Sequence, residues 1–260
     1  MHTGVNTQKA TIVTTSWDDG HPLDIRLAEM LARYAVVGTF YVPLRYESVR
    51  VMDKKDIRAL RAMGMEIGSH TLTHPNLTKV DKDEAIYELV ESKKRLEDIV
   101  GEEIVSFCYP AGKFNSVSRS CVIDSNYRLA RTTVAFRTDC DFDPFCMPVS
   151  FQLYPHTRFV SLRHALKEGN LRGLLSWCRF WEMENDPVKL AQRVLPYCQS
   201  NGGIWHMWGH SWEIDKFHLW SVLEDVLRRI SNLRDVLYLT NSQVLDTVPP
   251  PALASAPSAT

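Results

Sequence analysis

The sequence predicts an α/β protein built on a parallel sheet or barrel, and three observations support that class. Short β-branched runs alternate with segments of helical periodicity through most of the chain. Helix start and stop signals separate them; Asp53, for example, precedes a periodic apolar face and Gly64 follows it. The length of 260 residues suits one large α/β domain.

The expected elements alternate in type from the first strand onward. The run "ATIVTTSW" (10–17) is β-prone, and the apolar spacing behind it predicts a helix over about 23–34. Gly101 ends a long helix, and Asp186-Pro187 restarts the helical region after a break at Gly169-Asn170. The further expected elements are a strand over 36–44, a helix after Asp53, a strand over 65–70, a helix over 83–100, a strand over 103–110, a helix capped near Asn115, a strand over 127–136, helices between 159 and 199, a strand over 202–212, a helix over 215–230 and a strand over 235–240.

No linker composition or repeat interrupts this series of seven or eight strands. We therefore expect one catalytic domain over residues 1–248. The tail "PPPALASAPSAT" (249–260) is rich in Pro, Ala and Ser and is expected to be disordered.

Charge and composition exclude several classes of partner. Lys+Arg 30 against Asp+Glu 31 leave a net charge of −1, so no global field favours nucleic acid or an anionic membrane. No apolar run reaches the roughly 18 residues of a membrane span, and the N-terminus lacks the pattern of a secretory signal. The six cysteines contain no CxxC, which is typical of reduced thiols in a cytoplasmic protein. No protein partner is evident, and a neutral substrate fits best.

Carboxylate and imidazole side chains gather at the ends of successive strands. Asp18 and Asp19 end the first strand, and His70 and His74 follow the third. In a parallel sheet these ends meet at one edge. Two adjacent aspartates repel unless a cation or proton lies between them, although Asp-Asp-Gly is also ordinary turn chemistry.

These four residues predict an open metal site. Pro75 favours a single tight turn over a helix, and in either geometry His70 and His74 can reach one metal ion. Two His and one carboxylate leave positions for water and substrate, as in catalytic sites. Successive side chains point in different directions, so Asp19 can bind the ion while Asp18 removes a proton from water. The alternative is that the two histidines only hydrogen-bond within a loop.

The late strand "GGIWHMWGHSWE" carries two histidines with different expected roles. His206, Trp208 and His210 share one face by alternation, and His210 lies nearest the C-terminal end. There it can protonate a leaving amine, whereas His206 lies ~13 Å deeper and is expected to be structural or to support the site. Trp208 can stack on a sugar ring, although core packing is the usual role of tryptophan.

Together the motifs "SWDDG", "SHTLTH", "FCYPAGK" and "GGIWHMWGHSWE" resemble the motif set of the polysaccharide deacetylases (NodB homology, carbohydrate esterase family 4), over about residues 10–245. The resemblance implies a distorted (β/α) barrel, TIM-barrel-like, with about seven parallel strands. It implies a divalent metal ion, usually zinc and sometimes cobalt, nickel or iron. The implied reaction is hydrolysis of an acetamido group on a sugar.

By position, the resemblance also assigns roles to single residues. Asp18 resembles the family's general base and His210 its general acid, while Thr71 occupies the place of the hydroxyl residue in the second motif. The metal ligands would be Asp19, His70 and His74. The substrate groove would be walled by Tyr109, Pro110 and Gly112, with Trp208 as a further contact.

Two departures from the family pattern concern the surroundings of the base. The third motif often begins with an arginine that holds the base aspartate, and Cys108 stands in that position here. Arg131 at the next strand end is a candidate to supply the missing guanidinium, although a surface position is the commoner place for arginine. The tryptophan-bearing fourth motif is not recognisable.

Three other functions remain open at this point. A metal-dependent hydrolase of non-sugar amides, formamides or imides would use the same groups. An iron oxygenase shares the ligand set of two His and one carboxylate but usually has a β-sandwich scaffold. A degenerate carbohydrate-binding module would have kept the fold without the chemistry, against which the intact Asp18, Asp19, His70 and His74 argue.

Overall fold

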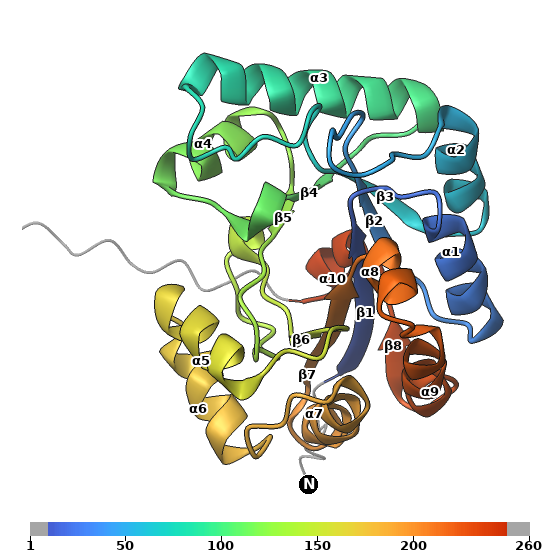
Figure 1. Ribbon diagram of the computed structural model, residues 1–260, viewed down its shortest axis with the longest axis vertical. Helices are drawn as coiled ribbons and strands as arrows, with labels where there is room; N and C mark the ends of the chain where they lie inside the picture. Colours follow the sequence, from blue (N-terminus) through green and yellow to red (C-terminus); the bar gives the residue numbers. More distant parts are fainter. Residues whose placement is uncertain (1–9, 249–260) are drawn as a thin grey trace, which may run out of the picture.

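The protein is built on one parallel sheet whose strands alternate with helices (Figure 1). The structure is a computed structural model and describes residues 10–248. The sheet has eight strands in the order β5-β4-β3-β2-β1-β7-β6, with β8 paired to β1 beside this path. The strands are β1 Thr11–Asp18, β2 Thr39–Val42, β3 Glu66–Ser69, β4 Ser106–Cys108, β5 Leu129–Arg131, β6 Phe151–Gln152, β7 Gly203–Gly209 and β8 Val236–Tyr238.

Helices surround this sheet, and most of them connect one strand to its parallel neighbour (Figure 1). The N-terminal ends of several carry the expected capping side chains; Asp53 accepts hydrogen bonds from two backbone N–H groups of α2. The helices are α1 Asp24–Arg33, α2 Lys54–Ala62, α3 Lys82–Val100, α4 Ser116–Asp124, α5 Arg158–Lys167, α6 Leu171–Arg179, α7 Pro187–Asn201, α8 Ser211–Lys216, α9 Trp220–Ile230 and α10 Asn241–Thr247, with 3-10 turns at Pro110–Gly112 and Pro144–Cys146.

A short extended segment before β6 brings the two ends of the sheet together. Met147 donates its N–H to the Ala130 carbonyl on β5 at 2.9 Å, and Ser150 donates to the His206 carbonyl on β7 at 2.8 Å. The sheet therefore curls into an irregular barrel, and the expected distorted (β/α) fold is confirmed.

Strand β1 lies at the centre of the sheet and is buried along its whole length. On one side it pairs with β7 from Thr11 to Trp17, while β8 pairs with its first three residues and β2 with its last three. Trp17 packs into the apolar core at this end, so Asp18 ends, and Asp19 directly follows, the longest strand of the sheet. The carboxyl ends of β1, β3, β4, β5 and β7 converge on one side of the barrel.

The structure differs from the sequence prediction in the last third of the chain. The single helix expected over 215–230 is two helices, α8 and α9, because His218 between them takes a left-handed φ of 56°. The two-residue strand β6 is too short to show alternation, and α10 was not expected.

The described residues leave some predictions untested. The tail 249–260 lies outside them, and the single domain over 1–248 stays a prediction. Within residues 10–248, no helix combines the length and apolar character that a membrane crossing requires.

Candidate metal centre

Asp19, His70 and His74 meet at the carboxyl end of the barrel, as the sequence predicts. Asp19 follows β1 directly, and the two histidines lie in the loop after β3. The Asp19 Oδ1 atom is 3.4 Å from His74 Nε2 and 3.7 Å from His70 Nε2. One ligand atom from each of the three side chains lies within 4.8 Å of the others, which is close enough for them to share a metal ion.

The protonation of His70 supports a cation at this point. Its Nδ1 lies 2.8 Å from the Cys108 carbonyl oxygen, which can only accept, so Nδ1 carries the hydrogen. Burial lowers the pKa of His70, and burial together with His70 lowers the pKa of His74 to about 4. In the neutral His70 ring, Nε2 then carries a lone pair that faces the Asp19 carboxylate. Two electron-rich groups repel each other at this distance, and a divalent cation bound between Nε2 and the carboxylate would make the arrangement favourable.

The loop that carries the histidines is held in a conformation that few side chains adopt freely. Thr71 and His74 have φ values of 68° and 60°. The Thr71 hydroxyl accepts the His74 N–H at 2.9 Å, so Thr71 shapes the turn. Glu88, buried on α3, accepts the N–H groups of Leu72 and Thr73 at 2.9 and 2.8 Å. This buried carboxylate fixes the loop and hence the separation of the two imidazoles.

Asp18 lies behind the metal centre in an ion pair with Arg131. The Arg131 Nη2 atom hydrogen-bonds to Asp18 Oδ1, and the Arg131 side chain is completely buried. Burial alone would raise the pKa of Asp18, but the charge and hydrogen bond of Arg131, together with the charges of His70 and His210, outweigh burial and hold that pKa below its usual value. Asp18 is therefore ionised at neutral pH.

Cys108 and Arg131 occupy equivalent places on neighbouring strands. The two residues are register partners in the β4–β5 pairing, and the Cys108 thiol lies 3.7 Å from Asp18 Oδ2. The side chains at both positions thus reach the same carboxylate. Arg131 on β5 thus contacts Asp18 from the strand next to the one that carries Cys108.

His210 faces the metal centre from the opposite side of Asp19. Its Nε2 lies 3.7 Å from Asp19 Oδ2, and its Nδ1 donates to Glu213 Oε2 at 2.6 Å. Burial favours the neutral ring, but the hydrogen bond to Glu213 and the charges of Asp19 and Asp18 raise the pKa of His210 to about 9. Gln152 donates to the same Glu213 oxygen at 3.1 Å and fixes its orientation.

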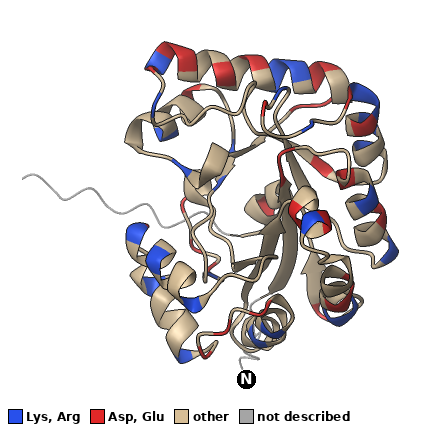
Figure 2. Ribbon diagram, in the orientation of Figure 1, with Lys and Arg blue, Asp and Glu red and all other residues tan. Residues whose placement is uncertain are grey.

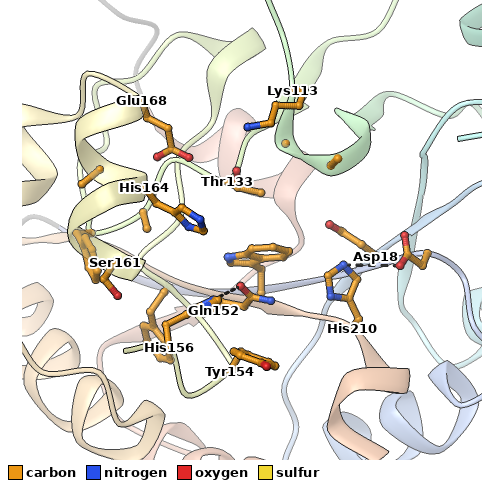
Figure 3. Close-up of a pocket in the computed structure, with 18 of the residues that line it drawn as sticks. Asp18, Lys113, Thr133, Gln152, Tyr154, His156, Ser161, His164, Glu168 and His210 are labelled. Atoms are coloured by element: carbon orange, nitrogen blue, oxygen red, sulfur yellow. Dashed lines mark hydrogen bonds and ion pairs between the residues drawn. The ribbon is translucent and has the colours of Figure 1, made fainter. Parts of the chain in front are cut away.

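The metal centre opens into a cavity of about 420 Å³. Figure 3 shows Asp18 and His210 at one end of it and Lys113, His164 and Glu168 at the other. Of the predicted substrate contacts, the cavity is lined by Gly112 and Trp208.

Two predicted substrate contacts lie behind the cavity wall. Tyr109 and Pro110 do not line the cavity in the part of the chain that the structure describes. The Tyr109 ring is completely buried, and its hydroxyl donates to the Phe145 carbonyl at 3.1 Å. Both residues support the turn that brings Gly112 to the cavity.

His206 lies deeper in the barrel and does not line the cavity. Its Nε2 is 2.9 Å from the Ser16 hydroxyl oxygen and its Nδ1 is 3.1 Å from the Pro148 carbonyl oxygen. Burial and the nearby Arg131 charge lower its pKa to about 3, so the ring is neutral.

Several residues around the site were not found by sequence reasoning. The Tyr46 ring stacks on His74 with centroids 4.0 Å apart, and Trp212, for which the sequence suggested only sugar stacking or core packing, donates its Nε1–H to Asp19 Oδ2 at 2.9 Å. Glu213 follows His210 by three residues, a helical spacing that could have indicated the pair. Glu88 and Gln152 come from distant parts of the chain, and no local pattern marks them.

One further carboxyl group is buried beside the site. Asp24, at the start of α1, is completely buried, and neither of its oxygens has a hydrogen-bond partner within the described residues. Burial, together with the charges of Asp19 and Asp18, raises its pKa well above the usual value. Asp24 is thus a neutral acid over a wider pH range than an exposed aspartate.

The fold and the site together describe a distorted (β/α) barrel with a candidate metal centre at its carboxyl end, and comparison with known proteins shows what this chain is similar to. The family model described as polysaccharide deacetylase matches residues 5–130, just under half of the chain. The matched part contains Asp18, Asp19, His70 and His74. The recognition of this family from the motifs is confirmed.

Individual relatives agree with this result at low sequence identity. YxkH of Bacillus subtilis (strain 168), named provisionally as a polysaccharide deacetylase, is 22% identical over 128 residues, which are 48% of this chain and 45% of the relative. This chain therefore spans less than half the length of that curated relative.

Solved structures extend the similarity of fold to nearly the whole chain. A protein of Mycobacterium smegmatis, provisionally named a polysaccharide deacetylase, matches with a TM-score of 0.67 and 17% identity over 96% of both chains. BA3943 of Bacillus anthracis, described as a CE4 family pseudoenzyme, matches with a TM-score of 0.56 and 15% identity over 92% of this chain and 66% of its own. At such identities these likenesses show the fold alone.

Proposed function

We propose that the protein is a metal-dependent carbohydrate deacetylase that removes an N-acetyl group from a substrate containing an amino sugar. One observation carries the proposal. Two neutral imidazoles and a carboxylate converge at the carboxyl end of the barrel, with a second ionised carboxylate and a protonated histidine beside them.

The proposed metal ligands are Asp19, His70 and His74. A divalent cation held there, for which we propose zinc with cobalt, nickel or iron as alternatives, would acidify water and polarise the acyl oxygen. The three ligands leave the side facing the cavity for substrate and water.

The proposed proton transfers follow from the charges on Asp18 and His210. Asp18 accepts a proton from the water as the water oxygen bonds to the acyl carbon. His210 then donates its Nε2 proton to the nitrogen as the carbon–nitrogen bond breaks, which releases acetate and a free amine. Glu213 holds the imidazolium in place from its Nδ1 side.

The proposed substrate contacts are Trp208 and the backbone at Gly112. The indole offers a flat apolar surface in the cavity wall, which suits one face of a sugar ring. Gly112 has a φ of 63°, and a Cβ atom there would lie 2.2 Å from the Thr133 hydroxyl oxygen. Glycine thus permits the close approach of this turn to its neighbour.

Metal content and amine release together test the proposal. We expect purified protein to contain one divalent ion per chain, to release acetate and amine from N-acetylated sugars, and to lose that activity to a chelator. Asp19→Asn is the matched control, because it removes a ligand and leaves Asp18 in place. Turnover of formamides or imides but of no acetamido sugar would favour the non-sugar amidohydrolase. Sugar binding without turnover by the metal-loaded protein would favour the degenerate binding module.

A further inference from the structure

Helices α5 and α6 and the turn that follows α6 carry an unusual concentration of exposed apolar side chains. Seven of the thirteen large hydrophobic residues exposed on the described chain lie between residues 159 and 183. Single exposed apolar residues are ordinary, but a cluster of this kind marks a surface that contacts something other than water. The cluster consists of Phe159, Leu162, Leu166, Leu171, Leu175, Phe180 and Met183.

The spacing on α5 separates this cluster from the core. Phe159, Leu162 and Leu166 follow one another at intervals of three and four residues and therefore form one stripe along the helix. Ser161 and Ala165 lie on the other side, where they are buried and line the cavity. The helix thus covers the cavity with one face and presents a second apolar face outward.

Positive charge flanks the apolar stripe. Between residues 158 and 179 five cations stand against one acid, Glu168, which leaves a local charge of +4 in a chain whose net charge is −1. All five are exposed, and none forms an ion pair within the described residues. Figure 2 shows these blue segments on α5 and α6 at the edge of the molecule. The cations are Arg158, Arg163, Lys167, Arg172 and Arg179.

We propose that the outer surface of α5 and α6 docks on an anionic lipid bilayer. An apolar stripe with Lys and Arg beside it is the pattern by which helices lie in the interface of such a membrane, with the cations near the head groups. A second copy of the chain is a poorer occupant, because a two-fold contact would bring the same cations against each other. Lipid head groups complement the charge and acyl chains accept the apolar side chains.

Docking on this surface would place the cavity wall next to the bilayer, since α5 contributes to both. The substrate class that follows is a saccharide attached to a membrane lipid. This consequence rests on the proposed deacetylase function, whereas the docking itself does not.

Vesicle flotation tests the docking without any measurement of activity. The full chain is mixed with vesicles of phosphatidylcholine alone or with phosphatidylglycerol added. We expect it to float with the anionic vesicles and to remain behind with the neutral ones, and added salt should weaken the binding. The double variant Arg163→Gln with Lys167→Gln should weaken binding to the anionic vesicles roughly 30-fold. This value follows because each cation near an anionic surface contributes about 1 kcal/mol to binding.

Variants of the apolar stripe and matched surface variants complete the test. Phe159→Ser with Leu166→Ser should reduce flotation, whereas Tyr87→Ser on α3, which removes a side chain of similar exposure, should not. Equal flotation with neutral and anionic vesicles, or none with either, would overturn the proposal. So would a dimer in sedimentation velocity that the Phe159→Ser and Leu166→Ser changes dissociate, because a second copy would then cover the surface.

Discussion

Replacing Arg131 with methionine removes a completely buried cation that forms an ion pair with Asp18. The Arg131 side chain is 0% exposed and that of Asp18 is 5% exposed. Methionine fills much of the space of the arginine stem but carries no charge. The variant therefore leaves a buried carboxylate without its partner.

The expected cost comes from the burial of both groups. Removal of one member of a buried ion pair destabilises a protein by about 3–5 kcal/mol, far above the ~0–1 kcal/mol of an exposed pair. With a urea slope of about 3 kcal/mol per M, the unfolding midpoint should fall by about 1–2 M. Urea unfolding in the presence of a chelator measures this loss independently of metal binding.

The double variant Arg131→Met with Asp18→Asn separates this explanation from simple loss of packing. Since it removes both charges, we expect it to regain at least about 2 kcal/mol relative to Arg131→Met alone. A double variant as unstable as the single one would refute the reasoning, and so would a single variant that loses less than about 1 kcal/mol.

Three further predictions concern neighbouring groups. Asp18→Asn should lower kcat by roughly 10²–10⁴, which is the usual contribution of a general base, and should leave the metal content unchanged. A loss of metal as large as that caused by Asp19→Asn would contradict the separate roles of the two aspartates. His210→Ala should lower kcat strongly with metal retained, whereas His206→Ala should mainly lower the thermal midpoint of unfolding. A loss of kcat confined to the His206 variant would mean that His206, and not His210, is the general acid. Because the pKa of Asp24 is raised in the folded protein, the folded protein keeps a proton that the unfolded chain releases above about pH 4. The free energy of unfolding of the wild type therefore falls as the pH rises beyond that point. Asp24→Asn does not titrate and should therefore gain stability over wild type by up to ~1.4 kcal/mol per pH unit in that range, a difference that thermal unfolding at pH 4 and pH 8 would show or exclude.

The sequence predicted the fold and the convergence of the first strands well, because both follow from local patterns. Asp18 and Asp19 directly follow a β-prone run, and His70 and His74 end another, so the rule for parallel strands brings them together. The same rule suggested Arg131, and the structure has it in contact with Asp18.

What the sequence could not predict depends on contacts between distant segments. Glu88 clamps the histidine loop from a helix, and nothing in its own surroundings distinguishes it from the other acids of that helix. Tyr109 lies within the motif "FCYPAGK", whose resemblance to the family predicted a wall of the substrate groove, yet its ring is completely buried. The net charge of the chain, which is near zero, gave no sign of the five cations on α5 and α6, because a sum over the chain contains no information about where the charges lie.

The register of β4 and β5 has a consequence for how this site can change in evolution. Position 108 and position 131 reach the same carboxylate, so a lineage can transfer the arginine from one strand to the other without moving the backbone. The order of the two substitutions matters, since an ancestor with neither arginine would carry an uncompensated buried aspartate. An ancestor with both would crowd two cations around one acid but keep it ionised. The second route avoids the uncompensated charge, and a search that requires an arginine at position 108 would miss the pairing of Arg131 with Asp18.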